Sequence, residues 1–451
     1  MLPEIDQRMK KQSHDLIRIL STRQADFAEQ FAAIRERGAQ TNEAADSAAR
    51  AIVKAVRERG DAAVIEMTAR FDKVKLKPAE LRVSDSEIRG ATARVPAEAV
   101  KALRLAAKRI AAFHSKQRMR SWMYRDSAGL RLGQQITPLE RVGVYVPGGH
   151  AAYPSSVLMT VVPARVAGVR EVIMVSPAGK DGLSPAVLAA ASIAGVDQIF
   201  RIGGAQAVAA LAYGTATIPR VDKIVGPGNA YVQAAKKLVY GTVDIDKMAG
   251  PSEVLVIADE SADPTFVAAD LLAQAEHGSG DECAVMLSPS KRIIARVATE
   301  LAAQLEELPR RDAIAKVLRQ RGALIQVRNL DEAVEVAEQV APEHLELIVQ
   351  EPQRLAGRIR NSGALFLGAH APAPLGDYLA GPNHVLPTGG TARFFSPLGV
   401  YDFVKRTSVV QASPAGLRRL GPSVAALARL EGYDAHAAAV EKRYFQARTK
   451  R

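Results

Sequence analysis

The chain contains a single cysteine, Cys283, among its 451 residues. One cysteine cannot form a disulfide within the chain. It also excludes structural zinc sites built from four cysteines or from two cysteines and two histidines. Any metal ion must therefore be held by histidine, carboxylate or amide groups.

The sequence also lacks a long apolar run. No segment approaches the roughly 18 consecutive apolar residues that a membrane-spanning helix needs, because Pro163 and Arg165 interrupt the most apolar stretch. The N-terminal residues M-L-P-E-I-D-Q-R-M-K-K include acidic side chains and do not form the apolar core of a secretory signal. We therefore expect a cytoplasmic protein without a membrane partner.

Basic residues are in excess, with a formal net charge of +12. An excess of this size can mark a nucleic-acid surface, but Lys and Arg are spread through helical patterns and accompany no known nucleic-acid-binding motif. We expect no nucleic-acid partner. The simpler interpretation is a solvated basic surface on a protein that handles anionic cofactors.

Short apolar segments alternate with helical patterns from Arg141 onward, beginning with R-V-G-V-Y-V, and a second such series begins at Glu253. This alternation predicts parallel sheets with helices on both faces and functional loops at the carboxyl ends of the strands. Apolar spacing predicts further helices over about residues 1–40 and from Val95 to His114. The Gly- and Pro-rich stretch between Gly368 and Ser396 predicts a long, functional loop.

Gln274 and His277 are the first candidate metal ligands. They are three residues apart at the end of a predicted helix, so their side chains share a face. The alternative is a histidine that interacts with its own helix dipole beside a solvated glutamine. Asp377, His384 and His436 could complete a mixed nitrogen and oxygen ligand set, which suits zinc and tolerates manganese or cobalt.

Glu343 and His344 are adjacent and precede the predicted strand L-E-L-I-V. A neighbouring carboxylate at a strand edge could prepare the imidazole for general acid-base work. An exposed dipeptide on a loop is the competing interpretation.

Two glycine-rich turns, Gly148-Gly149 and Gly226-Pro227-Gly228-Asn229, each follow a strand and precede a helix. Exposed amides at a helix N-terminus attract phosphate groups, but glycine used only for a tight turn competes with that interpretation. Cys283 could form a thiohemiacetal with an aldehyde. Its place in the apolar strand C-A-V-M-L favours a buried, inert thiol.

Short strings along the chain together resemble histidinol dehydrogenases. They include V-G-P-G-N-A-Y-V, L-A-Q-A-E-H, A-P-E-H-L-E-L, G-D-Y-L-A-G-P-N-H and E-G-Y-D-A-H, and the resemblance runs in order from about Ala39 to Val440. Members of that family oxidise L-histidinol through an aldehyde to L-histidine, the last step of histidine biosynthesis. They use two NAD molecules and one zinc ion in each subunit.

Pattern and resemblance together predict an α/β fold with two Rossmann-like parallel-sheet domains and small helical domains at both ends. We expect a helical N-terminal segment over residues 1–39 and a second Rossmann-like domain, on the NAD side, over 145–252. The first α/β domain, with the metal and catalytic residues, is expected over 40–144 and 253–398. A helical C-terminal domain, exchanged between the subunits of a homodimer, is expected over 399–451.

The resemblance implies a role for each candidate residue. The positions that correspond to zinc ligands are Gln274, His277, Asp377 and His436. In the corresponding catalytic pair, His344 takes the alcohol proton and Glu343 activates water at the aldehyde stage. The positions that correspond to NAD contacts are Tyr145, Gln206 and Asn229. The positions that correspond to substrate contacts are Ser252, Gln274, His277, His344, Asp377, Glu431 and His436.

The leading hypothesis is therefore a zinc- and NAD-dependent histidinol dehydrogenase whose homodimer shares its active sites. One alternative is a dehydrogenase on the same scaffold that oxidises another polar alcohol, such as a sulfonated diol. Another is a basic binding protein that has lost the chemistry, which the complete set of acid, base and ligand positions argues against. The segment G-S-G-D-E-C after His277 differs from the usual sequence of the family, and the last nine residues extend beyond the family's usual end.

Overall fold

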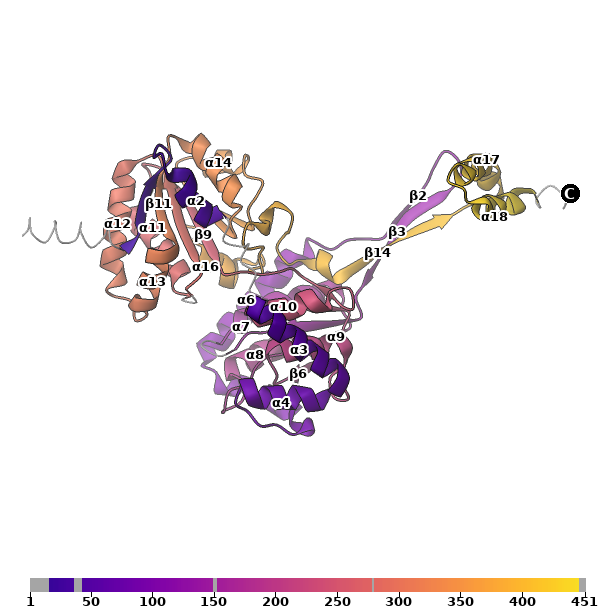
Figure 1. The fold of residues 1–451 in the computed structure, drawn as a ribbon, viewed down its shortest axis with the longest axis horizontal. Coiled ribbons are helices and arrows are strands. Elements are labelled where there is room, and N and C mark those ends of the chain that lie inside the picture. Colours follow the sequence, from indigo (N-terminus) through magenta and orange to yellow (C-terminus); the bar gives the residue numbers. More distant parts are fainter. Residues whose placement is uncertain (1–15, 36–42, 149–151, 278–279, 446–451) are drawn as a thin grey trace, which may run out of the picture.

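The computed structural model describes residues 16–35, 43–148, 152–277 and 280–445. They form two α/β lobes and an extended arm that ends in a pair of helices (Figure 1). None of the helices in this described part is long and apolar enough to cross a membrane. The α/β prediction is confirmed.

The first lobe is built on a five-stranded parallel sheet in the order β6-β5-β4-β7-β8. Its strands are β4 (Arg141–Tyr145), β5 (Glu171–Val175), β6 (Gln198–Phe200), β7 (Lys223–Val225) and β8 (Asp244–Ile245). Alternate residues of each strand face opposite sides, so helices cover both faces. The helices of one face are α6 (Ala97–Ser115), α7 (Pro154–Ala167) and α8 (Pro185–Ala194), and those of the other are α3 (Glu43–Arg59), α4 (Asp61–Phe71), α9 (Gly204–Tyr213) and α10 (Ala230–Val239).

The helices between residues 43 and 115 belong to this five-stranded lobe. Val53 and Val56 of α3 pack in one core with α9 and α10, and Ile110 of α6 packs in another with α7. The expected grouping of residues 40–144 with 253–398 is therefore wrong. The apolar stripes of these helices indicated that they pack, but a stripe does not identify the sheet against which it packs.

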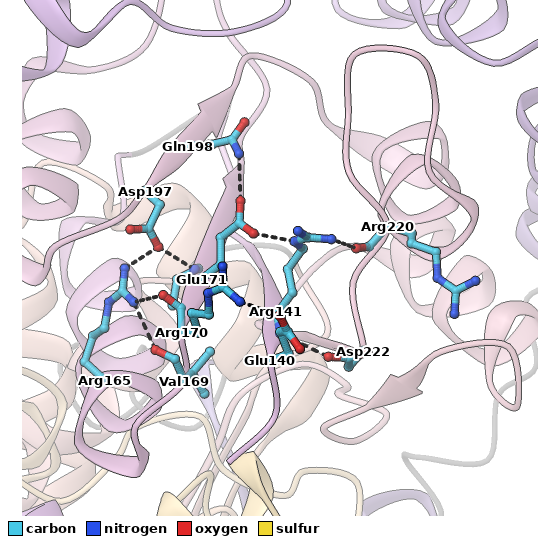
Figure 2. Close-up of polar contacts among 11 residues, drawn as sticks. Glu140, Arg141, Arg165, Val169, Arg170, Glu171, Asp197, Gln198, Arg220 and Asp222 are labelled. Atoms are coloured by element: carbon cyan, nitrogen blue, oxygen red, sulfur yellow. Dashed lines mark hydrogen bonds and ion pairs between the residues drawn. The ribbon is translucent and has the colours of Figure 1, made fainter. Parts of the chain in front are cut away.

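Ion pairs and hydrogen bonds join the amino ends of β4, β5 and β6 (Figure 2). Glu171 accepts hydrogen bonds from Arg141 Nε at 2.6 Å and from Gln198 Nε2 at 2.7 Å. Asp197 pairs with Arg165 and accepts the backbone N–H of Val172 at 2.7 Å. These contacts occupy the amino edge of the sheet and leave the carboxyl edge open for a ligand.

The second lobe is built on a six-stranded parallel sheet in the order β1-β11-β10-β9-β12-β13. Its strands are β1 (Arg18–Ser21), β9 (Glu253–Ala258), β10 (Cys283–Ser288), β11 (Gly322–Gln326), β12 (His344–Ile348) and β13 (Ala364–Leu367). Helices α11 (Pro264–Ala275), α12 (Lys291–Leu305) and α13 (Arg311–Arg321) cover one face, and α2 (Phe27–Arg35), α14 (Leu330–Val340) and α15 (Pro352–Ala356) cover the other.

The apolar spacing predicts that the N-terminal segment is helical throughout, but part of this segment forms a strand. β1 pairs in parallel with β11, from Arg18 opposite Ala323 to Ser21 opposite Gln326. Leu16 and Leu20 are buried in the cores on opposite faces of the sheet. Because apolar residues four apart suit both a helix face and a short edge strand, the sheet decided between them. α2 confirms only the later part of the predicted helix, and residues 1–15 lie outside the described residues.

The C-terminal segment is also not purely helical. Antiparallel strands β2 (Trp122–Arg125), β3 (Arg131–Pro138) and β14 (Val404–Gln411) form the arm, with β3 in the middle. Its tip carries α17 (Pro414–Leu430) and α18 (Asp434–Phe445). The predicted helical unit over 399–451 thus begins with a strand, which pairs with a segment about 270 residues earlier.

Residues 368–396 form the irregular segment that their composition predicts. It contains one short helix, α16 (Ala373–Leu375), a π-helical turn over Gly376–Ala380 and a 3-10 turn over Thr391–Arg393. Three more 3-10 turns elsewhere in the described chain span Pro78–Glu80, Ala91–Arg94 and Val400–Phe403, with the short helix α5 (Asp85–Gly90) between the first two of them.

A fully buried ion pair holds the chain where it leaves the five-stranded lobe. Lys236 on α10 pairs with Asp246 and donates a hydrogen bond to Gly226 O at 3.0 Å. Asp246 also accepts the N–H groups of Gly226 and Lys247 at 2.8 and 2.7 Å. The pair therefore ties the Gly226 turn to the segment that crosses to β9.

Replacing Lys236 by methionine should destabilise the protein strongly. The change leaves the buried Asp246 carboxylate without its cation, which costs about 3–5 kcal/mol. Urea unfolding should show a lower midpoint for Lys236→Met than for the wild type. Lys237→Met, at the exposed neighbouring position, is the matched control and should change stability by less than about 0.5 kcal/mol. Equal midpoints for the two variants would contradict this account.

Candidate active site

The candidate catalytic residues gather at the amino end of the six-stranded sheet. His344 begins β12, and Glu343 directly precedes it, beside Glu253, the first residue of β9. This is opposite to the prediction that functional loops lie at the carboxyl ends of strands. The reason is the chain crossing at residues 246–252, which brings the start of β9 to the other lobe.

Glu343 is a buried carboxyl held by the neighbouring strand. Its Oε2 accepts the backbone N–H of Glu253 at 2.8 Å, and its own N–H donates to Glu253 Oε2 at 3.3 Å. Burial raises the pKa of Glu343 to about 8. A carboxyl with such a pKa can exchange a proton near neutral pH, as a general base or acid must.

His344 lies between two carboxylates. Its Nδ1 is 2.9 Å from Glu253 O and 3.5 Å from Glu343 Oε2, and its Nε2 is 3.3 Å from Asp377 Oδ1. Burial by itself lowers the pKa of His344, but Glu343 and Asp377 together outweigh burial and raise it to about 10. The contact with Glu253 O orients the ring so that Nε2 faces Asp377.

Asp377 reaches this cluster from the π-helical turn. Such turns expose side chains that a regular helix would direct elsewhere. Arg109 of the five-stranded lobe donates to the carbonyls of Leu379 and Ala380 at 2.5 and 3.3 Å, which satisfies acceptors at the end of the turn. Gly381 follows with φ of +112°, and a Cβ there would lie 3.0 Å from Arg109 O. The turn is thus shaped by contacts from the other lobe.

Gln274 and His277 lie at the end of α11, on the side of Asp377. His277 is exposed. Burial raises the pKa of the Asp377 carboxyl, but His344, His384 and, least, His277 outweigh burial and hold that pKa below its usual value. Gln274 is buried, and its Nε2 has no hydrogen-bond partner among the described residues. An amide that is not bonded internally at this atom is available to a ligand.

These three donors fit part of a zinc site. An amide oxygen, an imidazole and a carboxylate are suitable ligands. Within the described residues of one chain, no three His, Cys, Asp or Glu side chains come together closely enough to hold a metal ion.

Glu431 and His436 are the predicted residues that one chain does not bring to this cluster. Glu431 caps α17, and His436 lies on α18 against Tyr433, with 5.1 Å between ring centroids. Both helices lie at the far tip of the arm (Figure 1). Ser252, in contrast, directly precedes Glu253 at the cluster, and its carbonyl accepts the Cys283 N–H at 3.2 Å.

His384, which the sequence offers as a further possible ligand, makes internal contacts instead. Its Nδ1 is 3.0 Å from Asp377 O and its Nε2 is 3.4 Å from Ser156 Oγ. Ser156 belongs to the first turn of α7, so His384 fastens the Asp377 segment to the five-stranded lobe. Asn383 adds a bond of 2.6 Å to Met159 O of the same helix.

A cleft of about 1200 Å³ lies at the carboxyl edge of the five-stranded sheet. The three candidate NAD contacts, Tyr145, Gln206 and Asn229, all line it. Gly148 and Ala152, between β4 and α7, line it too, so it adjoins the helix that carries Ser156. A dinucleotide needs a site of this kind, at the carboxyl edge of a parallel sheet.

The local geometry of the cleft follows from its turns. Tyr145 OH accepts the Gly204 N–H at 3.0 Å, and burial raises the pKa of Tyr145 to about 12. Gly226 has φ of +115°, and a Cβ there would lie 2.2 Å from Tyr145 O. Asn229 caps α10 by accepting two backbone N–H groups at 3.1 Å. Gln206 Nε2 is buried without a partner among the described residues and can donate to a ligand.

Glu253 and Asp72 are site residues that the sequence reasoning missed. Glu253 contacts both Glu343 and His344. Asp72 lines the cleft, and burial raises its pKa to about 6. The segment A-G-P-S-E, which ends at Glu253, is a further string that resembles the family and could have indicated this residue, whereas Asp72 follows an ordinary amphipathic helix and has no such signal.

Cys283 is buried at the start of β10, where its Sγ is 3.5 Å from Arg321 O. It packs on the α14 side of the sheet with Leu255 and Leu345. His344 alternates with Leu345 along β12 and therefore faces the opposite side. This placement fits the inert interpretation of the thiol.

Comparisons with known proteins agree over the length of the chain. The family model described as histidinol dehydrogenase matches residues 35–444. The chain is 52% identical over 430 residues to the histidinol dehydrogenase of Geobacter sulfurreducens, covering 95% of this chain and 100% of that protein. It is 55% identical over 394 residues to that of Nitrosomonas europaea, covering 87% and 91%.

A solved structure extends this similarity to the fold. The crystal structure of histidinol dehydrogenase from Elizabethkingia anophelis matches with a TM-score of 0.90 at 34% identity, covering 96% of this chain and 99% of that one. Sequence similarity and fold similarity thus point to one family. The chain belongs to the histidinol dehydrogenase family.

Proposed function

We propose that this chain oxidises L-histidinol through L-histidinaldehyde to L-histidine, with two NAD molecules as oxidants. The observation that carries the proposal is the buried contact of His344 with Glu343 and Asp377. Asp377 lies in the segment that His384 fastens to α7, a helix that starts beside the proposed dinucleotide cleft. A base and a hydride acceptor are the two components that oxidation of an alcohol requires.

In this proposal His344 takes the proton of the alcohol. Glu253 O orients the ring through Nδ1, and Nε2, which contacts Asp377 at 3.3 Å in the free chain, would become available to the substrate oxygen once Asp377 holds the metal. Glu343 activates the water that attacks the aldehyde, a step for which its raised pKa of about 8 is suited. Each oxidation passes a hydride to one NAD molecule, so the complete reaction releases two NADH.

A zinc ion is the proposed resident metal, one in each subunit. Gln274, His277 and Asp377 would hold it together with a fourth ligand, His436. When bound, zinc would orient the amine and imidazole nitrogens of histidinol. The remaining proposed substrate contacts are Ser252, His344 and Glu431.

We infer that the fourth ligand and Glu431 come from a second copy of the chain. In one chain both residues lie at the tip of the arm, away from the cluster (Figure 1). The arm and its helices expose large apolar side chains, including Trp122 at 52%, Val410 at 70% and Leu430 at 83%. Apolar surface of this extent favours burial against a partner. A homodimer with exchanged C-terminal helices would cover the arm and complete the site.

The proposed NAD site is the cleft at the carboxyl edge of the five-stranded sheet. Gln206 would donate from its amide, Tyr145 would support the turn at Gly204, and Asn229 would keep the start of α10 open to phosphate. The alternative activity on a sulfonated diol has no support from the comparisons, since the relatives described above are all named histidinol dehydrogenases.

Counting NADH released per histidinol consumed tests the four-electron reaction. The wild type should release two. Glu343→Gln should lower the second oxidation by about 10²–10⁴-fold, the usual contribution of a general base, so that its ratio falls toward one and aldehyde accumulates. No turnover of histidinol by the wild type would overturn the proposed function. If Glu343→Gln still released two NADH per histidinol at the wild-type rate, Glu343 would not be the group that activates water.

Mixing inactive variants tests the shared active site. His344→Ala and His436→Ala homodimers should each be inactive. After subunit exchange, half of the dimers are mixed and each has one intact site, so activity should return to about a quarter of the wild type. A mixture of His344→Ala with Gln274→Ala is the control, because both changes lie in the body of the chain and no intact site can form. Equal activity of the two mixtures would mean that one chain builds its own site.

Cys283→Ser should retain most of the activity, since the thiol lies on the far face of the sheet and a hydroxyl can still donate to Arg321 O. Steady-state NADH formation is the measurement. A fall in kcat of more than about a hundredfold, equivalent to about 2.7 kcal/mol of barrier, would assign the thiol to the chemistry.

A further inference from the structure

Two carboxyl groups meet inside the six-stranded lobe, next to the catalytic cluster. Glu346 is two residues after His344 on β12, so both side chains point to the same face of the sheet, the one covered by α11. Its exposed fraction is 1%. Asp270 lies on α11, and its carboxyl interacts with that of Glu346. Neither residue takes part in the proposed reaction.

Glu346 is also bonded to the segment that carries Asp377. Its Oε1 accepts the backbone N–H of Ala373 at 2.7 Å. Ala373 begins α16, which leads directly into the π-helical turn. Its Oε2 is buried and has no hydrogen-bond partner among the described residues. The Asp270 carboxyl, which interacts with Glu346, is the neighbouring group that could donate to it when protonated.

Asp270 connects the pair to the proposed metal ligands. It lies four residues before Gln274, so the two side chains are on one face of α11, one turn apart. Burial raises the pKa of both Asp270 and Glu346, and each carboxyl further affects the other. Neighbouring buried carboxyl groups disfavour the state in which both are ionised, so the pair favours holding a proton over carrying two charges.

We propose that the Asp270–Glu346 carboxyl pair positions α11 and the Asp377 turn relative to His344. One pair of side chains contacts the helix of Gln274 and His277, the strand of His344 and the segment of Asp377. This inference rests on the proposed function for the roles of those residues. Asp270 and Glu346 act through them and do not touch substrate or cofactor.

Three variants test the pair. Glu346→Ala removes both contacts. Glu346→Gln is the conservative variant, because its amide can accept from Ala373 and donate to Asp270. Ala373→Pro removes only the N–H that Glu346 accepts, and a proline suits the first residue of a helix that follows an extended Pro372.

Two measurements besides activity test the role of the pair in the full-length protein. The first is hydrogen exchange of residues 374–380, with residues 154–167 of α7 as the internal control. The second is competition for added Zn²⁺ against a chromophoric chelator. Glu346→Ala should speed exchange in 374–380 at least about tenfold and weaken Zn²⁺ retention at least about tenfold, with α7 unchanged. Its kcat should fall while the KM for NAD stays constant, because the cleft belongs to the other lobe.

Glu346→Gln should recover most of the exchange protection and Zn²⁺ retention that Glu346→Ala loses. Ala373→Pro should speed exchange in 374–380 even if Glu346→Ala fails to fold. Wild-type exchange in the Asp377 turn of both Glu346→Ala and Ala373→Pro would overturn the inference. Uniformly faster exchange, in α7 as well as in 374–380, would also overturn it and leave a purely structural role. Absent histidinol turnover in the wild type would instead count against the proposed function, because exchange is measured without substrate.

Discussion

Glu253 is the residue on which the geometry of the candidate active site depends. Its N–H donates to Glu343, its carbonyl contacts His344, and its carboxylate accepts the N–H groups of Glu343 and Gly389. All these groups are buried or nearly so, and a buried polar group without a partner costs about 1–3 kcal/mol. The first residue of β9 therefore determines where the acid-base pair and the end of the Asp377 segment lie.

The two candidate sites lie at opposite edges of their sheets. In the five-stranded lobe the ligand cleft occupies the carboxyl edge, as the rule for parallel sheets predicts. The chain then leaves β8, passes the Lys236–Asp246 pair and enters β9 at its amino end. Because that crossing is short, the amino edge of the six-stranded sheet faces the first lobe. The candidate catalytic cluster is found at that edge.

The Asp377 segment depends on both lobes at once. Its π-helical turn is held by Arg109 and, through His384 and Asn383, by α7 of the five-stranded lobe. Glu346 holds its start from the six-stranded lobe. An irregular segment has few internal hydrogen bonds, so its shape comes from what surrounds it. A change in the angle between the lobes would thus move Asp377 relative to His344.

The sequence by itself determined the local elements and the family. The alternation of short apolar segments with helical patterns predicted the α/β units from Arg141 onward, and the motifs around Gln274, Glu343 and Asp377 indicated the family, because both signals depend on neighbouring residues. Only the tertiary structure decided that residues 18–21 form an edge strand, that α3 to α6 cover the five-stranded sheet, and that β14 pairs with β3. Such pairings join segments that are distant in the chain, and an apolar stripe does not specify its partner. The same limit applies to Glu346, whose contacts with Asp270 and Ala373 exist only once strand, helix and turn have packed together.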